Sequence, residues 1–510
     1  MTPTAGLARG RTIAAPAASA RSGTRAAGAP TRGPDGARRG TVLLSVPAGH
    51  HVEDLLRGPF LPALLEVRPA PRVVVVTPYV DDRRLAAELS AAGVAAEPMP
   101  VPRVGPAARV VESILSERFL LDSGLRAVRL QRDRARLLDG WRGRGLLIAI
   151  KSALTRLPVS RRTWFRLAGA VTDVEECRRL LDRHRPDLVV TATAGFLPAE
   201  VPLIYAAWRR GVPQMGVDLG WDNLSSKYHT VLPVDWLAVW NETMRDEAVR
   251  YHGFRPDQVR VTGAVPFDAY VGDGVVPSRE TFLASIGADP GRPLVTLATA
   301  PAQVYPTTGT VARLLSAAAR DGRFGREAQL LVRVHPRDRL EDYTSLHDGR
   351  QVFVEKPFEQ LDRAEGQGEL DAFTPGADGR RRLAATLAHS DVLVNFASTT
   401  TIEAALFDTP VVNIGFDDEV SLPLPLSIRR YYEYEHYQPV VETGGARVAT
   451  SADDLLAAVR RYLDDPAADR DGRRELVRRC GARTDGAAGR RLADWVLATL
   501  AGVTAGGGTA

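Results

Sequence analysis

The stretch "DVLVNFASTTTIEAALFDTPVVNIGFD", residues 391–417, decides how the chain folds. Its pattern predicts an apolar strand over 391–397, a run of four hydroxyl residues, a helix, and a second apolar strand over 409–416. Strands that alternate with helices in this way are typical of a parallel sheet covered by helices. The hydroxyl run stands where the first strand gives way to the helix, so its purpose is the first question.

Two hypotheses explain the run from Ser398 to Thr401. The hydroxyls can cap the helix, with Ser398 as N-cap and the helix extending from Thr399 to about Phe407, or they can cradle a phosphate at the helix start. Glu403 lies four residues after Thr399, on the same helical face. Its carboxylate could accept both hydroxyls of a ribose. On this segment alone, the two hypotheses are equally supported.

The same alternation extends outward in both directions. Apolar runs predict strands at 41–49, 72–78, 187–192, 213–218 and 237–240, and a second series at 294–300, 328–336, 350–357, 391–397 and 409–416. The fold class is therefore α/β, with two Rossmann-like doubly wound domains facing a central cleft. We assign the first domain to 41–265, with a helical insertion at about 104–170, and the second to 266–500. A Gly- and Pro-containing hinge is expected at 263–293.

The ends of the chain have a different composition. Residues 1–40 hold seven Arg and one acid, and residues 501–510 are small and polar, so we expect a disordered basic tail and a flexible end. The tail has a formal charge of +6 and the whole chain one of +5, so the remaining residues carry −1. No global positive field remains to attract nucleic acid. We therefore exclude nucleic acid as a partner.

No targeting or membrane-spanning segment is evident. The chain has two cysteines, lacks the apolar core of a signal peptide, and has no apolar run near the ~20 residues that a membrane helix needs. We expect a bacterial, cytoplasmic protein. The Arg-rich insertion is either a solvated helical segment or a basic amphipathic surface for anionic lipid, in which Trp141, Trp164 and Phe165 sit among the cations.

The stretch "VRVHPRD", residues 332–338, places two basic side chains at a predicted strand end. Pro336 stops the strand, and Arg333 and His335 share a face because strand side chains alternate. Together they could neutralise a leaving phosphate, and His335 could also donate a proton to it. A structural His packed beside the strand end is the alternative.

Two loops of the first domain carry candidates for the acceptor side. The stretch "VPAGHHVEDLL" (46–56) follows the first strand, and His50, His51 or Asp54 could bind an acceptor or remove its proton, although a polar loop explains them too. The stretch "VDLGWDNLSSKYH" (217–229) offers an indole and several polar groups, with a tight turn as the alternative. Its candidate residues are Trp221, Asp222, Asn223 and Lys227.

These motifs resemble the donor half of glycosyltransferases with the GT-B fold. The strand–HP–turn, the Ser/Thr run before helix and Glu, and the strand "TPVVNIG" are similar to those of bacterial sialyl- and Kdo-transferases and of CDP-glycerol polyol-phosphate transferases. The segments "VRVTGAVPFDAY" (259–270) and "CGARTDGAAGRRLADWV" (480–496) resemble the hinge and closing segments of the latter group. The resemblance covers residues 40–500 in architecture and is specific to the superfamily, not to a substrate.

The resemblance implies roles for individual residues. Arg333 and His335 would hold the donor phosphate, Ser398, Thr399 and Thr400 would cap it, and Glu403 would bind the ribose, with no metal and no cofactor. The expected activity is transfer of a sugar from a nucleotide-sugar donor to a hydroxyl of a surface glycan or lipid-linked acceptor. The base stays open among His51, Asp54, Asp218 and Asp222. Three alternatives remain: a CDP-linked polyol-phosphate transferase, a sugar-nucleotide 2-epimerase, which would need acids in the first domain, and a non-catalytic scaffold.

Overall fold

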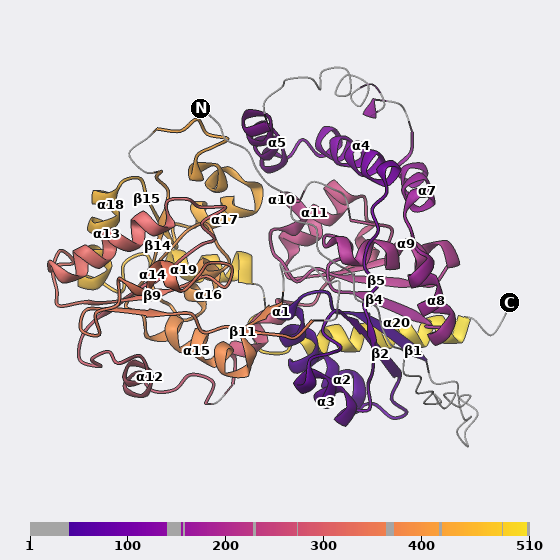
Figure 1. Ribbon diagram of the computed structural model, residues 1–510, viewed down its shortest axis with the longest axis horizontal. Helices are drawn as coiled ribbons and strands as arrows, with labels where there is room; N and C mark the ends of the chain where they lie inside the picture. Colours follow the sequence, from indigo (N-terminus) through magenta and orange to yellow (C-terminus); the bar gives the residue numbers. More distant parts are fainter. Residues whose placement is uncertain are drawn as a thin grey trace, which may run out of the picture. The chain divides into compact units, whose positions relative to one another are not determined.

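Two parallel β-sheets carry the fold, one in each half of the chain (Figure 1). The computed structural model describes residues 40–139, 153, 155–156, 159–227, 231–272, 274–363, 372–417, 421–481 and 483–506. Both sheets belong to one compact unit that begins at Arg39. We call residues 41–265 the first half and residues 266–487 the second half. The predicted α/β fold with two doubly wound sheets is confirmed.

The first sheet has seven strands in the order β3-β2-β1-β4-β5-β6-β7, with all neighbours parallel. Its chain connections leave β1 in opposite directions, toward β2 and toward β4. In open α/β sheets, ligands bind beyond the carboxyl ends of the strands at such a reversal, which here lies between β1 and β4. The strands are β1 (Thr41–Ser45), β2 (Arg72–Thr77), β3 (Ala95–Pro98), β4 (Leu188–Thr191), β5 (Gln214–Val217), β6 (Trp236–Val239) and β7 (Val259–Val261).

The second sheet repeats this plan with six parallel strands in the order β10-β9-β8-β13-β14-β15. Here the reversal lies between β8 and β13. A short antiparallel pair, β11 (Glu359–Gln360) and β12 (Phe373–Thr374), stands apart from it. The strands of the sheet are β8 (Leu294–Ala298), β9 (Gln329–Arg333), β10 (Val352–Glu355), β13 (Val392–Asn395), β14 (Val411–Ile414) and β15 (Arg447–Ala449).

Helices connect these strands. Those of the first half are α1 (Gly49–His51), η1 (Val52–Arg57), α2 (Phe60–Glu66), α3 (Arg83–Ala91), α4 (Pro106–Ser123), α5 (Arg126–Asp139), α7 (Arg161–Val171), α8 (Glu175–His184), η2 (Pro198–Glu200), α9 (Val201–Arg210), α10 (Asn223–Ser226), α11 (Glu242–His252) and η3 (Pro256–Gln258). Those that follow are η4 (Val265–Tyr270), α12 (Arg279–Ile286), α13 (Thr308–Arg320), α14 (Glu341–Thr344), α15 (Gly376–His389), α16 (Thr400–Leu406), η5 (Ile428–Glu433), η6 (Glu435–Tyr437), α17 (Gln438–Glu442), α18 (Ala452–Asp464), α19 (Arg470–Leu476), η7 (Val477–Gly481) and α20 (Ala488–Gly506).

Local sequence explains why these segments adopt their structures. All five residues of β1, "TVLLS", are buried, as expected for a strand covered on both faces. In α18, Ser451 accepts a hydrogen bond from the N–H of Asp454 at 3.1 Å and caps the helix. Leu455, Val459 and Tyr462 are buried at spacings of four and three residues, so one face of α18 packs on the second sheet.

The predicted helical insertion contains α4, α5 and α7. The buried side of α4 and that of α7 belong to one core, to which Leu115, Trp164 and Phe165 contribute. The membrane hypothesis placed the two aromatic residues among surface cations, and this was wrong, because Trp164 is 6% and Phe165 8% exposed. Trp141 lies outside the described residues. Throughout the described part of the chain, every helix is too short or too polar to cross a bilayer.

The last helix, α20, packs on the first half although it follows the second half in sequence (Figure 1). Leu492 and Val496 are fully buried in a core that also contains Val42. Its start is fixed by Asp268, whose carboxylate accepts hydrogen bonds from the backbone N–H groups of Ala488 (3.0 Å) and Gly489 (2.7 Å). From the sequence we expected residues 488–500 to belong to the second domain and residues 501–510 to form a flexible end. The helix that begins in the first of these segments continues to Gly506.

The predicted hinge segment 263–293 contains η4 and α12. Gly263 has a φ of +99°, and a Cβ there would lie 3.1 Å from the Cβ of Ala488, so this turn needs a glycine to pass α20. The η4 helix is well packed, because Phe267 is 2% exposed. It ends at Tyr270, which is hydrogen-bonded to α16. The predicted basic tail falls outside the described residues.

Candidate functional site

The reversal point of the second sheet brings together the stretch that opened the sequence analysis and the end of β8. Ser398, Thr399 and Thr400 follow β13, and Thr299 follows the neighbouring strand β8. Thr299 accepts a hydrogen bond from the backbone N–H of His335 at 2.8 Å, which holds the turn after β9 beside the end of β8. The predicted donor-side residues therefore gather at the position where open α/β sheets bind ligands.

Glu403 sits on α16 and is hydrogen-bonded to Tyr270, the last residue of η4. The phenol of Tyr270 donates to its carboxylate at 2.8 Å. Burial raises the pKa of Glu403, while the Tyr270 hydrogen bond and the charges of Arg380 and Arg333 oppose that rise. The carboxylate thus lies in a positively charged region and already accepts one hydroxyl hydrogen.

The hydroxyl run divides into an accessible part and a buried part. Ser398, Thr399 and Thr400 are half-buried, and the Ser398 hydroxyl accepts from the N–H of Thr400 at 3.3 Å. Thr401 is fully buried, where its hydroxyl contacts the phenol of Tyr437 at 3.0 Å. The helix begins one residue later than predicted, because Thr399, which makes no side-chain capping hydrogen bond, is the N-cap residue. Capping therefore does not account for the whole run.

Arg333 is less available than the sequence suggested. It is 5% exposed and forms a 2.9 Å ion pair with Glu355 on the adjacent strand β10. Its guanidinium also lies over the ring of Phe358, 5.4 Å from the centroid. One of its nitrogens, Nη2, has no hydrogen-bond partner among the described residues. Arg333 can therefore offer a phosphate its positive charge and one donor nitrogen, but not a bidentate pair of hydrogen bonds.

His335 is half-buried at the end of the turn after β9. Its Nδ1 accepts the backbone N–H of Arg337 at 3.1 Å, which places the ring hydrogen on Nε2. Burial lowers the pKa of His335 to about 4, with Arg337 and Lys356 adding to the effect. At neutral pH the side chain is a hydrogen-bond donor, and it would protonate a leaving phosphate only after the phosphate itself had raised this pKa.

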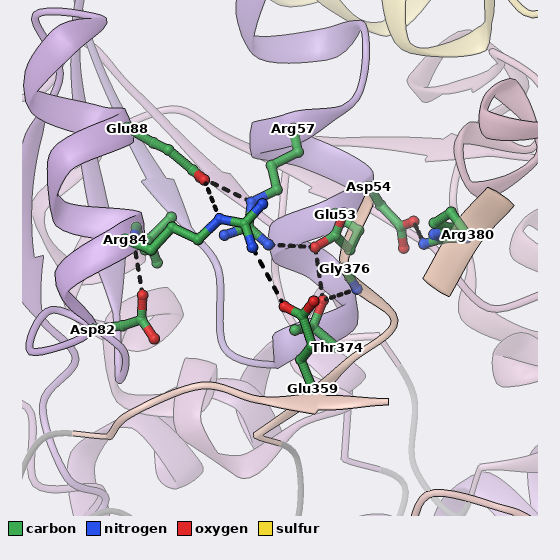
Figure 2. Close-up of polar contacts among 11 residues, drawn as sticks. Glu53, Asp54, Arg57, Asp82, Arg84, Glu88, Glu359, Thr374, Gly376 and Arg380 are labelled. Carbon is green, nitrogen blue, oxygen red and sulfur yellow. Dashed lines mark hydrogen bonds and ion pairs between the residues drawn. The ribbon is translucent and has the colours of Figure 1, made fainter. Parts of the chain in front are cut away.

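Asp54 is held by an ion pair between the halves (Figure 2). Its partner is Arg380 on α15, and Asp54 is 5% exposed. Nearby, Glu53 accepts from the hydroxyl of Thr374 at 2.7 Å, and Arg57 pairs with Glu53. Burial raises the pKa of Asp54, and the charge of Arg380 opposes this. In this structure Asp54 connects the halves, and its role as a base stays a prediction.

The two histidines after β1 differ in environment. His50 is exposed, whereas His51 is 3% exposed, and their rings meet edge to face with centroids 4.1 Å apart. Burial, followed by the charge of His50, lowers the pKa of His51 well below its usual value. The Nδ1 atom of His51 has no hydrogen-bond partner among the described residues. At neutral pH the imidazole is uncharged, and its lowered pKa makes it a weak base.

The loop after β5 is packed against the second half rather than open. Trp221 is 6% exposed, and its Nε1–H donates to the hydroxyl of Thr399 at 2.9 Å. Its ring also meets that of His436 edge-on, with the ring centroids 5.0 Å apart. The expected role of Trp221 as an open sugar platform does not fit, because so little of the side chain is exposed. The indole instead joins the first half to the hydroxyl run.

The polar residues of this loop are mostly engaged with one another. Asn223 donates to Asp218 at 2.6 Å, and Asp222 accepts from the hydroxyl of Ser226 at 2.9 Å. Burial raises the pKa of Asp218 to about 7, and its Oδ2 has no partner among the described residues. The pKa of Asp222 is lowered, because Lys227 and His436 outweigh its burial. Lys227 is half-buried beside this pair.

Sequence reasoning missed several residues of the site. Tyr270 and Arg380 contact predicted site residues, although neither was among the candidates. Glu200 is fully buried beside β1 and β4, where it accepts hydrogen bonds from Ser45 and from the backbone of Ala192. Only Tyr270 had a signal, since it ends the segment "VRVTGAVPFDAY" that supported the resemblance.

The geometry can be compared with known proteins. No known protein family and no curated protein matches the sequence. Among solved structures, the S. aureus MnaA–UDP structure matches with a TM-score of 0.52 and 12% identity, over 90% of this chain and 97% of that one. A UDP-GlcNAc 2-epimerase from Neisseria meningitidis, bound to UDP-GlcNAc, matches at 0.50 and 12%, over 90% and 100%. The fold is of the GT-B type.

A glycosyltransferase from Rickettsia africae is also similar, with a TM-score of 0.45 and 10% identity over 90% of this chain and 99% of that one. The near-complete coverage of the matched structures agrees with two sheets joined in one unit. At such low identities the likeness concerns the fold. The chemistry has to be argued from the side chains.

Proposed function

We propose that this protein is a metal-independent glycosyltransferase. It would move a sugar from a nucleotide-sugar donor to a hydroxyl of a surface glycan or a lipid-linked acceptor, in the cytoplasm or at the inner face of the plasma membrane. The second half would bind the donor and the first half the acceptor. The hydrogen bond from Tyr270 to Glu403 carries this proposal more than any other observation.

That hydrogen bond indicates that Glu403 can bind hydroxyl groups. A carboxylate that accepts a phenol O–H can accept a ribose O–H with the same geometry, and a ribose diol would supply two. Glu403 lies one helical turn beyond the half-buried hydroxyls. A nucleoside diphosphate placed with its ribose on Glu403 would direct its phosphates toward those hydroxyls and the start of α16.

The proposed phosphate contacts are neutral donors together with the guanidinium of Arg333. The Nε2–H of His335, the hydroxyls of Ser398 and Thr400, and the unpartnered nitrogen of Arg333 are the available groups. Donors of this kind, fixed before the reaction, stabilise a departing phosphate through directed hydrogen bonds and charge. They are the basis for proposing a reaction that needs no metal or cofactor.

The acceptor must lose a proton, and the structure favours Asp218 among the four candidate bases. Its pKa is raised to about 7, and Oδ2 is unpartnered. Asp54 is paired with Arg380, and Asp222 has a lowered pKa. A base works best when its pKa lies near the operating pH. Asp218 is 1% exposed, so a substrate reaches it only if the loop that contains Trp221 moves.

A 2-epimerase acting on a nucleotide sugar is the second candidate. The specific observation in its favour is that the first half holds buried acids, Asp218 and Glu247, each with one unpartnered oxygen. An epimerase exchanges the C2 hydrogen of its substrate without an acceptor, and acids facing the sugar would move that proton.

Nucleotide binding is tested first by a thermal-shift panel of UDP-, GDP-, CMP-, CDP- and dTDP-linked sugars. A ligand at 100 times its Kd stabilises the native state by about 2.7 kcal/mol. We expect one nucleotide class to raise the Tm of the wild type and not that of Glu403→Ala. Tyr270→Phe serves as the control, because it removes the competing phenol and keeps the carboxylate. If no donor shifts the wild type, the scaffold alternative replaces the proposal.

The reaction type is tested with the donor that binds. The wild type is incubated with it in D2O, without acceptor, and the recovered nucleotide sugar is examined by mass spectrometry. A transferase leaves the C2 hydrogen in place. Deuterium at C2 would replace the transferase proposal with the epimerase, and a preference for a CDP-linked polyol would replace it with polyol-phosphate transfer.

A further inference from the structure

Charge is strongly segregated between the helical insertion and the rest of the chain. Residues 101–171 contain fourteen Arg, one Lys and five acids, which gives a formal charge of +10. With the tail 1–40 at +6 and the whole chain at +5, the remaining residues carry −11. Such an asymmetry turns the positively charged insertion toward a negatively charged partner as the two approach.

Part of this charge lies on the outer side of two helices that share one core. The inner sides of α4 and α7 contact each other and belong to one core, to which Ile114 and Ala168 contribute. On the outer sides, Arg109, Arg162 and Arg166 are exposed and have no carboxylate partner within the described part of the chain. Arg162 and Arg166 are one helical turn apart, so they lie on the same face of α7.

Exposed aliphatic side chains stand close to these cations in the sequence, on the same two helices or just before them. Val110 on α4 is 58% exposed, Leu167 on α7 is 46% exposed, and Val104, just before α4, is 37% exposed. Elsewhere in the described part of the chain, exposed large apolar residues are scattered, whereas most of them fall within 101–171. We call Val104, Arg109, Val110, Arg162, Arg166 and Leu167 the insertion surface.

From this arrangement we infer that the insertion surface docks on an anionic lipid bilayer. Arginines would contact lipid phosphates while the aliphatic side chains enter the headgroup region, which is the usual division on helices that lie in a membrane interface. The acidic remainder of the protein would be held away from the same negative surface. This docking does not depend on the proposed reaction.

Nucleic acid is a less suitable occupant of the insertion surface. Proteins that bind single strands stack bases on exposed aromatic rings, and rigid duplexes demand a regular cationic stripe. Trp164 and Phe165, the aromatic residues of α7, are buried, and each exposed large apolar residue of the described part is a Val or a Leu. Aliphatic side chains between arginines match acyl chains and phosphates.

The test is co-sedimentation of the full chain with vesicles of phosphatidylcholine alone or with phosphatidylglycerol added. We expect binding to the anionic vesicles only, weakened by salt. Since each basic residue near a membrane surface strengthens binding ~5-fold, the double variant Arg162→Gln/Arg166→Gln should bind roughly 30-fold more weakly. Because both side chains are exposed, the variant should keep the Tm of the wild type.

A matched control is available in the second half. Arg474 and Arg478 are also four residues apart and are 72% and 70% exposed, so Arg474→Gln/Arg478→Gln makes the same change of charge at another place. It should leave vesicle binding unchanged. The basic tail is identical in all three proteins, so its contribution cancels.

Each remaining outcome would overturn the inference. If the wild type fails to bind anionic vesicles at low salt, or if both double variants lose binding equally, the insertion surface is not the docking site. If a single-stranded oligonucleotide competes fully with the vesicles and its own binding is lost in Arg162→Gln/Arg166→Gln, the surface binds nucleic acid. The variant Val110→Ser/Leu167→Ser tests the contribution of the aliphatic side chains. If this variant binds anionic vesicles at high salt as well as the wild type does, the claim that these side chains enter the headgroup region is refuted.

Discussion

The side chains expected to hold a nucleotide sugar already have hydrogen-bond partners within the protein. Glu403 accepts a hydrogen bond from Tyr270, and Thr399 accepts one from Trp221. Both partners are donors, as ribose hydroxyls are. Binding of a donor must therefore exchange hydrogen bonds rather than create them, and the net gain per exchanged bond is small. Affinity would then come from the phosphates and from the buried area.

His335 gives a prediction for stability against pH. Its folded-state pKa of about 4 lies below the unfolded value of 6.5, so the folded protein binds fewer protons. Stability is therefore complete above pH 6.5 and is lost as the pH falls toward 4, by about 2 kcal/mol between pH 7 and 5. We expect His335→Gln to lose less stability over this range than the wild type, measured by urea unfolding. Equal losses would show that His335 titrates normally.

The strands were the most predictable elements, and the environment of the loops was the least. Strands such as β2 and β13 were located from runs of buried aliphatic residues, because a parallel sheet covered on both faces requires them. Trp221 and Arg333 were placed correctly at strand ends, but the sequence could not show that Thr399 and Glu355 would engage them. Such contacts depend on segments distant in sequence.

Helix α20 makes a prediction at the scale of elements. Leu492 is fully buried between α20 and the first half, so Leu492→Ala should lower the free energy of unfolding by about 2–5 kcal/mol. Leu138→Ala on α5 is the control, because that side chain is 59% exposed and should change stability by about 0.5 kcal/mol or less. Chemical denaturation monitored by circular dichroism measures both. Similar values for the two variants would contradict the packing of α20.

At the scale of the whole molecule, two of the ion pairs that connect the halves lie in contrasting environments (Figure 2). Asp54 and Arg380 have side chains 4% and 13% exposed, whereas Arg84 and Glu359, 3.6 Å apart, are 58% and 48% exposed. A buried charge without its partner is costly, and an exposed one is solvated by water. The two pairs therefore allow a matched comparison.

We expect Asp54→Asn to destabilise the protein by about 3–5 kcal/mol, because Arg380 would be left buried beside a neutral group. Glu359→Gln should cost about 1 kcal/mol or less. Urea unfolding of both variants measures the difference. A cost for Asp54→Asn as small as that for Glu359→Gln would mean that the contact between the halves opens readily in solution.

The return of α20 to the first half has a consequence for folding during synthesis. The first sheet is complete once β7 has left the ribosome, yet part of its hydrophobic core, Leu492 and Val496, is translated more than two hundred residues later. At about 5–20 residues per second, the sheet waits about 10–45 s with the surface under α20 uncovered. A nascent chain of this protein is therefore a natural client for chaperones that shield apolar surface until translation ends.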